Sequence, residues 1–337
     1  MRYRLFGQTG LRVSELFLGA MTFGDPDGPG ASLKESRRVL DAYADAGGNF
    51  VDTAVTYRGG ASEEYLGELL AERRDRFVLA TKYTLSRDGS DPNASGNHRK
   101  NLRLSLETSL RRLRTDHIDV YWVHIWDRNT PLEETMRALD DAVREGKILY
   151  VGISDAPSWV VARANTLAEW RGWTAFAGLQ VPYSLLKRDI ENELLPMAEA
   201  LGLTVAAWSP LANGILSGKY NTGAATRTRL NPSQVSDHDL AVAKTVGEVA
   251  DELGATSAQV ALAWVRAGSP SVHPIIGART AEQLADNLGV LDVTLEPDVV
   301  QRLNDASGFT RGFPMDFIDG TQGLVHGEVG AQVDNRH

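Results

Sequence analysis

Three ionisable side chains of different types close apolar segments of this sequence. They are Asp52 after FV, Lys82 after FVLAT and His124 after VYWV. A charged group at the end of a buried strand is costly unless a partner neutralises it or hydrogen-bonds to it. A carboxylate, an ammonium and an imidazole are complementary, so we expect the three side chains to lie together at one polar site.

Tyr57 lies one short loop beyond Asp52 and is close enough in the chain to join that site. An ion pair of Asp52 with Lys82 would put an ammonium beside the phenol, and a neighbouring positive charge favours proton release from a tyrosine. Such a tyrosine can donate a proton to a developing alkoxide. His124 can orient a carbonyl group and stabilise negative charge on its oxygen. These residue types therefore predict reduction of a carbonyl group.

Apolar runs of strand length alternate along the chain with amphipathic stretches of helical length. Runs that are apolar on both faces are typical of parallel sheets covered by helices. Eight β-then-α units with right-handed crossovers close most naturally into a barrel. We therefore predict an α/β fold, a (β/α)8 TIM barrel with an N-terminal β-hairpin and extended loops at its C-terminal face. The predicted strands are residues 16–21, 49–54, 77–82, 118–124, 149–154, 176–181, 204–209 and 272–277.

In the predicted barrel, the polar residues at the strand ends lie on the same side of the fold. The C-terminal ends of barrel strands meet at one rim, where barrel enzymes carry their active sites. An isolated lysine or histidine at a strand end is more often structural, but a convergence of many polar groups at one rim indicates catalysis. The further residues at predicted strand ends are Ser154 with Asp155, Gln180, Trp208 with Ser209, and Gly277 leading to Arg279.

Local signals predict where helices begin and end. In a capping box a hydroxyl accepts the backbone N–H three residues on, and the glutamate or glutamine at that position reaches back. Capping boxes are predicted at Ser32, Thr130 and Thr256. Glycines are favoured just past helix ends, where the backbone turns left-handed. The glycines predicted at such ends are Gly47, Gly146 and Gly202.

No linker or low-complexity run divides the chain, so we predict one domain over residues 1–337, with ~306–337 as a C-terminal loop or tail. Loops 83–99 and 210–238 also fall outside the repeat, and long loops in a compact domain are usually functional or disordered. The main rival fold, an open doubly wound sheet, requires a glycine-rich phosphate turn after its first strand. Residues 19–24 lack the G-x-G-x-x-G spacing of that turn.

Composition narrows the classes of partner. The net charge is −9, and both signs are mixed along the chain, which argues against nucleic acid and anionic membranes. No apolar stretch approaches a membrane span or a signal peptide, so we expect a cytoplasmic protein. There is no cysteine, which excludes disulfides and thiolate ligands. The histidines have no metal-binding spacing, so no metal site is predicted; those considered are His98, His117, His124 and His273.

The segments around these residues resemble the signatures of the aldo-keto reductases. NFVDTAVTYRGGASEEYLGELL contains Asp52 and Tyr57, ATKY contains Lys82, and YWVHIWD contains His124. The resemblance continues through EGKILYVGIS, GLQVPYSLL, WSPLANGILSGKY and IIGARTAEQLADNL and covers residues 1–305. Within this family, the chain is similar to bacterial NADP-dependent members near the branch shared with potassium-channel β subunits. The resemblance implies that Tyr57 is the general acid, Lys82 its cationic partner, Asp52 the residue that holds Lys82, and His124 the residue that orients the carbonyl.

The same resemblance implies a nicotinamide cofactor extended across the barrel rim. Ser154 and Gln180 would hold the carboxamide, and Trp208 would stack on the ring. Two departures from many relatives are Asp155 in place of asparagine and Trp208 in place of tyrosine, although either aromatic keeps the stacking surface. The implied cofactor-binding residues are Gly19, Met21, Thr22, Asp52, Ser154, Asp155, Gln180, Trp208, Ser209, Pro210, Leu211, Gly214, Lys219, Arg229, Gly277, Arg279, Gln283 and Asn287.

Arg279 favours NADP(H) over NAD(H). A guanidinium offers a fork of donors that matches the ribose 2′-phosphate. Arg279 also precedes Thr280-Ala281-Glu282-Gln283, where the free N–H groups of a helix start attract an anion. Thr280 and Gln283 would in addition form a capping box.

The leading prediction is therefore an NADPH-dependent reductase of aldehydes or ketones that acts on a small-molecule carbonyl substrate. One alternative is a biosynthetic ketoreductase of a nucleotide-linked keto sugar. Loop 83–99 and the tail could accommodate such a large substrate. Another is a redox-sensing regulatory subunit with incidental turnover. A Schiff-base isomerase or aldolase would need an uncharged Lys82, which Asp52 disfavours. Three tail residues are expected either to line the pocket or to cover the outer helices, namely Phe313, Met315 and Phe317.

Overall fold

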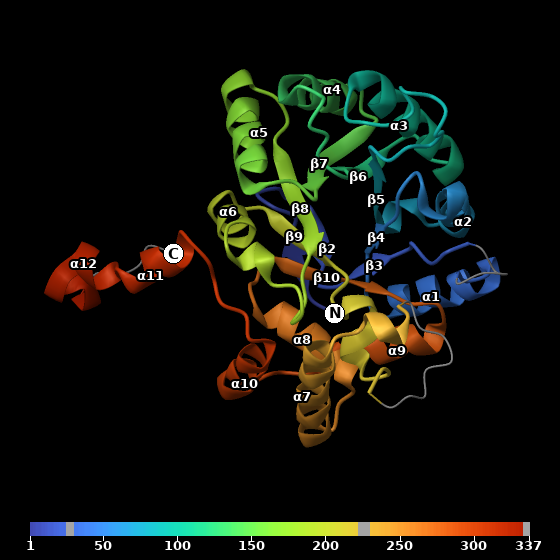
Figure 1. Cartoon of the computed structure of the whole chain (residues 1–337). Coiled ribbons are helices and arrows are strands. Elements are labelled where there is room, and N and C mark those ends of the chain that lie inside the picture. The colour runs from blue at the N-terminus through green and yellow to red at the C-terminus, as the bar shows by residue number, and fades with distance from the viewer. Residues whose placement is uncertain (25–29, 222–229, 333–337) are drawn as a thin grey trace.

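The computed structural model describes residues 1–24, 30–221 and 230–332. Eight parallel strands form a closed barrel in the order β10-β3-β4-β5-β6-β7-β8-β9 (Figure 1). Each predicted strand lies in this barrel, which confirms the (β/α)8 prediction. The strands are β3 (Phe17–Gly19), β4 (Phe50–Asp52), β5 (Val78–Tyr83), β6 (Ile118–Val123), β7 (Ile148–Ser154), β8 (Phe176–Pro182), β9 (Thr204–Trp208) and β10 (Val272–Gly277).

A small antiparallel hairpin closes the amino-terminal end of the barrel, as predicted. It consists of β1 (Tyr3–Leu5) and β2 (Arg12–Ser14). Phe6 at its turn is fully buried, with its ring centroid 6.0 Å from that of Phe50 and 6.1 Å from that of Trp122. Gly7 N donates to Thr204 Oγ1 at the start of β9, at 2.8 Å. The opposite, carboxyl end of the barrel is therefore left for a site.

Helices surround the barrel (Figure 1). Thr256 forms a complete capping box with Gln259, which confirms that prediction. Ser32 caps the first helix by accepting a hydrogen bond from Glu35 N, but the Glu35 carboxylate bonds to Arg38 and to Ala281 N instead of reaching back, so only half of that predicted box is present. The three predicted terminal glycines all adopt a left-handed backbone. The helices are α1 (Leu33–Asp45), α2 (Ala61–Leu69), α3 (Arg99–Leu113), α4 (Leu132–Arg144), α5 (Ser158–Arg171), α6 (Leu194–Ala200), α7 (Asp237–Leu253), α8 (Ser257–Ala267), α9 (Ala281–Leu288) and α10 (Pro297–Ser307).

The capping box predicted at Thr130 is wrong. Pro131 occupies the N-cap position of α4, and no side chain caps that helix. The Thr130 hydroxyl instead donates to Asp127 Oδ2 at 2.5 Å. The helix begins one residue later than predicted, because the first turn closes on Pro131 O, which accepts from Glu134 N and Thr135 N.

The segments outside the repeat have more structure than expected. Loop 210–238 contains the short 3-10 helices η4 (Ala212–Ser217) and η5 (Pro232–Gln234), and α7 begins within it. Residues 222–229 lie outside the described part of the chain, and so does the predicted phosphate ligand Arg229. Residues 84–98, by contrast, contain no helix or strand.

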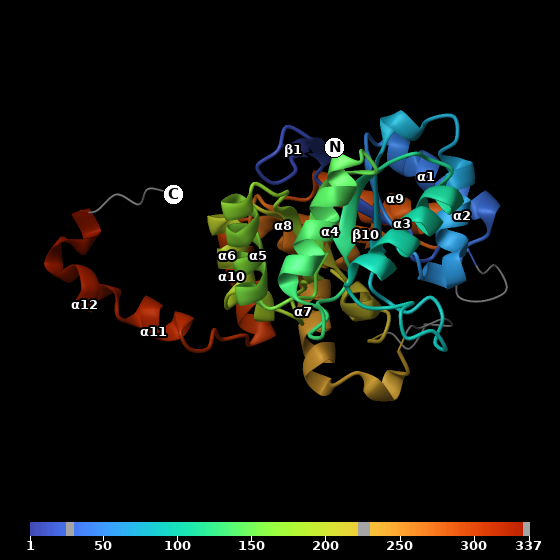
Figure 2. The ribbon, with the colours of Figure 1, turned by 90° about the horizontal axis from the view of Figure 1, so that it is seen from above.

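The C-terminal tail runs away from the barrel in both views (Figures 1 and 2). It forms the short helices α11 (Met315–Gly320) and α12 (Gln322–His326) and the 3-10 helix η7 (Gly327–Gln332). Phe313 is 82% exposed and Phe317 is 64% exposed. The expectation that Phe313 and Phe317 line the pocket or cover the outer helices is therefore wrong, because the chain leaves the barrel after α10. Met315, at the start of α11, is half-buried.

Candidate active site

Lys82 is the centre of a polar cluster at the carboxyl end of the barrel. Its side chain is fully buried and forms an ion pair with Asp52 at the end of β4. Its Nζ also donates to Thr53 O at 2.8 Å and to the Tyr57 hydroxyl at 3.1 Å. An ammonium has three protons to donate, and each has an acceptor here.

The surroundings of Lys82 keep it charged. Burial by itself lowers the pKa of Lys82, but the Asp52 carboxylate and Tyr57 oppose it and raise that pKa above its ordinary value. Burial raises the pKa of Asp52, while Lys82 and the Gln180 amide, whose Nε2 lies 3.1 Å from Asp52 Oδ1, favour the carboxylate. A charged lysine is a poor nucleophile, which disfavours the Schiff-base alternative.

His124 approaches the same cluster from the residue after β6. Its ring centroid lies 5.8 Å from that of Tyr57, and the two rings are nearly perpendicular. Burial, and secondarily the Lys82 charge, lower the pKa of His124 to about 3. The imidazole is therefore neutral near pH 7 and can donate one hydrogen bond without adding a positive charge to the site.

The low pKa of His124 makes the free energy of unfolding depend on pH. An unfolded histidine takes up a proton near its ordinary value of 6.5, whereas this folded one does so only near pH 3. The free energy of unfolding therefore decreases as the pH falls from 6.5 toward 3, and the decrease is about 2 kcal/mol at roughly pH 5.

We expect urea unfolding to give a lower free energy of unfolding at about pH 5 than at about pH 7. In His124→Gln, the part of this loss that comes from His124 should be absent. Buried His273, whose pKa is lowered to about 4, contributes a similar loss to both proteins, so their difference isolates His124. Identical pH dependence in the wild type and the variant would contradict the assignment.

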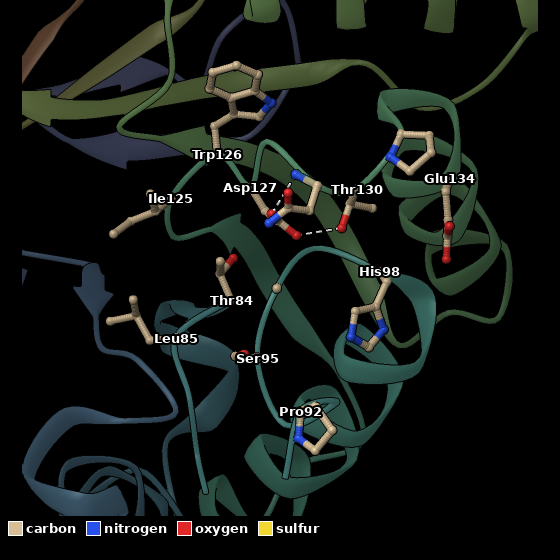
Figure 3. Close-up of a pocket in the computed structure, with 13 residues that line it drawn as sticks. Thr84, Leu85, Pro92, Ser95, His98, Ile125, Trp126, Asp127, Thr130 and Glu134 are labelled. Carbon is tan, nitrogen blue, oxygen red and sulfur yellow. Dashed lines mark hydrogen bonds between the residues drawn. The ribbon is translucent and has the colours of Figure 1, made fainter. Parts of the chain in front are cut away.

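A pocket of about 480 Å³ is lined by Ile125 and Trp126, which follow His124 in the chain (Figure 3). Its walls are the loops that follow β5 and β6, including Thr84, whose Oγ1 accepts a hydrogen bond from His124 N at 3.2 Å. The loop after β6 was not predicted to take part, although its sequence IWDRNT combines aromatic and polar residues directly after His124. The side chains shown there include Leu85, His98, Ile125, Trp126, Asp127 and Glu134.

The residues expected at the nicotinamide end lie on three neighbouring strands. Ser154 ends β7 beside Gln180 of β8, and Trp208 ends β9 opposite Pro182. Trp208 is 38% exposed, and its Nε1 donates to Asp155 Oδ1 at 3.2 Å. Asp155 thus fixes the indole at the rim, and burial raises the pKa of its carboxyl.

The loop after β9 carries the residues expected near the pyrophosphate. Ser209 and Gly214 both have left-handed backbones, with φ of 55° and 88°. A Cβ at Gly214 would lie 2.6 Å from Nζ of Lys219, so the glycine lets this lysine approach the backbone. Pro210 and Leu211 lie between them, and Pro210 is buried.

The residues expected at the adenosine end lie around β10, which pairs with both β3 and β9. Gly277 is opposite Gly19, and Thr22 Oγ1 donates to Ala278 O at 2.8 Å. Gln283 accepts from Arg279 N, and Asn287 donates to Gly277 O. Met21, which was expected from the first loop together with Gly19 and Thr22, is 41% exposed. The barrel therefore brings the described members of the predicted set to one rim.

Among the described residues, no group of three or more histidine, aspartate or glutamate side chains is arranged to hold a metal ion. No helix in the same part of the chain is long and apolar enough to cross a membrane.

The sequence pattern of the aldo/keto reductase family matches residues 15–307. The chain is a member of the aldo/keto reductase family. This reductase is 43% identical to norsolorinic acid reductase of Emericella nidulans, over 92% of this chain and 82% of that protein. It is 39% identical to an NADP(+) aryl-alcohol dehydrogenase of Phanerodontia chrysosporium, over 95% of this chain and 90% of that protein. The family and these relatives identify it as an oxidoreductase.

Proposed function

We propose that this reductase converts an aldehyde or ketone into an alcohol, with NADPH as the hydride donor and Tyr57 as the general acid. The observation that carries the proposal is the 3.1 Å contact of Lys82 Nζ with the Tyr57 hydroxyl, in a cluster where Lys82 is also paired with Asp52. A phenol beside a buried ammonium is a proton donor whose conjugate base is stabilised where it forms.

The reduced nicotinamide, when bound, supplies the hydride. The side chains supply the rest of the chemistry. Tyr57 donates its proton to the carbonyl oxygen as negative charge develops there, and the Lys82 ammonium stabilises the resulting phenolate. Neutral His124 donates a hydrogen bond to the same oxygen and orients the carbonyl. Asp52 keeps Lys82 charged and in place throughout.

The rim residues fit a phosphorylated dinucleotide. Among the residues that the structure describes, none forms a hydrogen bond or ion pair with the Arg279 guanidinium, whereas its backbone N–H is bonded to Gln283. A guanidinium of this kind is suited to a phosphate. The indole of Trp208 offers an exposed flat face for the nicotinamide ring.

Arg279→Ala is expected to weaken NADPH binding about 30- to 150-fold, because charge-assisted hydrogen bonds worth about 2–3 kcal/mol are lost. NADH, which lacks the 2′-phosphate, should bind almost equally well to both proteins. Titration with each cofactor, followed by tryptophan fluorescence, measures both affinities. Equal losses for NADPH and NADH would assign Arg279 a structural role.

We further propose an aromatic carbonyl substrate. The relatives named above are a norsolorinic acid reductase and an aryl-alcohol dehydrogenase. The pocket formed by the loops after β5 and β6 is lined by Trp126, Ile125 and Leu85, which suit an apolar ring. Asp127 and Glu134 in the same lining disfavour a negatively charged nucleotide sugar.

A screen with NADPH separates these substrate classes. We expect aromatic aldehydes and ketones to be reduced with higher kcat/KM than aliphatic carbonyls, and nucleotide-linked keto sugars to be the poorest substrates. Oxidation of NADPH is followed by its absorbance. A preference for the nucleotide-linked sugar would overturn the aromatic assignment while keeping the reductase assignment. Failure to bind NADPH would overturn both.

A further inference from the structure

An ion pair between a buried carboxylate and a half-buried guanidinium lies on the outer side of β5, the strand that carries Lys82. Glu63 of α2 is fully buried, and its Oε1 accepts a hydrogen bond from Thr81 Oγ1 at 2.7 Å. Its Oε2 lies 3.4 Å from Nη1 of Arg112 on α3. A buried carboxylate is costly without a cation, so Glu63 and Arg112 stand as one unit. The catalytic steps proposed above do not use them.

Arg112 also holds the loop that carries Tyr57. Its Nη1 donates to Val55 O at 2.8 Å. Gly60, at the end of this loop, makes room for the guanidinium, since a Cβ there would lie 2.3 Å from Arg112 Cζ. Arg58 in the same loop has a left-handed backbone, with φ of 53°. A loop in such a conformation keeps its shape only where surrounding contacts hold it.

The other end of the network reaches the strand of Lys82. Successive side chains of a strand point to opposite faces, so Thr81 faces Glu63 outside the barrel while Lys82 faces the site. Val55 N in turn donates to Lys82 O at 3.1 Å. The network therefore holds the backbone on both sides of the contact between Lys82 and Tyr57.

We propose that Glu63 and Arg112 are positioning residues that keep the Tyr57 hydroxyl at hydrogen-bond distance from Lys82. The inference rests on the proposed function, because it concerns the placement of the proposed proton donor. A displacement of about 1 Å at a reacting group can lower a rate on the order of 100-fold. Two residues outside the site can thus set its rate without touching substrate or cofactor.

Arg112→Met tests this proposal. We expect kcat for carbonyl reduction to fall about 10- to 100-fold while the Kd for NADPH stays unchanged, because the loop that moves carries the proton donor. Arg111→Met is the matched control: Arg111 is the next residue along α3, its side chain is exposed and bonds to Thr108, and kcat should be preserved. Unchanged kcat in Arg112→Met would overturn the proposal.

A second pair of variants separates positioning from stability. Arg112→Met alone leaves a buried carboxylate unpaired and lowers the Tm, whereas Glu63→Gln combined with Arg112→Met removes both charges. We expect the double variant to regain much of the Tm but not kcat, because Val55 O still lacks its donor. Arg112→Lys, which keeps a positive charge and a hydrogen-bond donor, should regain most of kcat. If kcat simply follows Tm through the series, the pair is only structural.

Hydrogen exchange gives a readout that does not depend on turnover. The backbone amides of residues 53–60 should exchange faster in Arg112→Met than in the wild type or Arg111→Met, because the loop has lost its outer attachment. Unchanged exchange would overturn the positioning role. A wild-type protein without reductase activity would instead overturn the proposed function, and the exchange result would still report whether Arg112 holds the loop.

Discussion

Tyr57→Phe is expected to lower kcat for carbonyl reduction by about 10²- to 10⁴-fold, the range typical of a lost general acid. The substitution removes only the hydroxyl, which lies 3.1 Å from Lys82 Nζ. The ring should remain beside His124, so the pocket keeps its shape. Steady-state kinetics with saturating NADPH measure kcat, and a fluorescence titration should give an unchanged Kd for NADPH.

Tyr3→Phe is the matched control for this experiment. Tyr3 lies in the N-terminal hairpin, and its hydroxyl donates to Gly47 O far from the catalytic rim. The control should keep the wild-type kcat. If Tyr57→Phe reduces a good substrate at the wild-type rate, the proton comes from another donor, and the role proposed for Tyr57 is wrong.

Lys82→Met is expected to cost about 3–5 kcal/mol of unfolding free energy, because it leaves a buried carboxylate without its counter-ion. Asp52 is 3% exposed, so water cannot take the place of the ammonium. The variant should also lose reductase activity, since the phenolate of Tyr57 would no longer be stabilised. Urea unfolding near pH 7 measures the stability loss.

The pH dependence of this loss gives an internal check. Burial already raises the pKa of Asp52, and removal of Lys82 raises it further. A carboxyl with a raised folded pKa stabilises the folded state at low pH and loses that contribution as the pH rises. The deficit of Lys82→Met should therefore shrink as the pH is lowered.

Asp52→Asn combined with Lys82→Met is the matched variant, because it removes both charges. It should be more stable than Lys82→Met alone but equally inactive. A single variant as stable as the wild type near pH 7 would mean that the folded state does not rely on the ion pair.

Much of the fold could be predicted because its signals are local. Runs such as residues 118–124 are apolar on both faces, and their alternation with helical stretches leaves few architectures open. Capping depends on residues three apart, and the box at Thr256 forms as predicted, while Ser32 provides the cap without the return contact of Glu35. The prediction at Thr130 failed because α4 begins one residue later, with Pro131 at the N-cap position.

The sequence by itself determined the barrel and the set of polar residues at its rim, because strand periodicity and residue type are properties of neighbouring positions. The contacts among those residues depended on the closed barrel. Gln180 meets Asp52 across 128 positions, and Arg112 meets Glu63 across 49. The neutral state of His124 and the outward course of the tail were likewise decided by the tertiary structure, since burial and direction depend on surfaces that are distant in the chain.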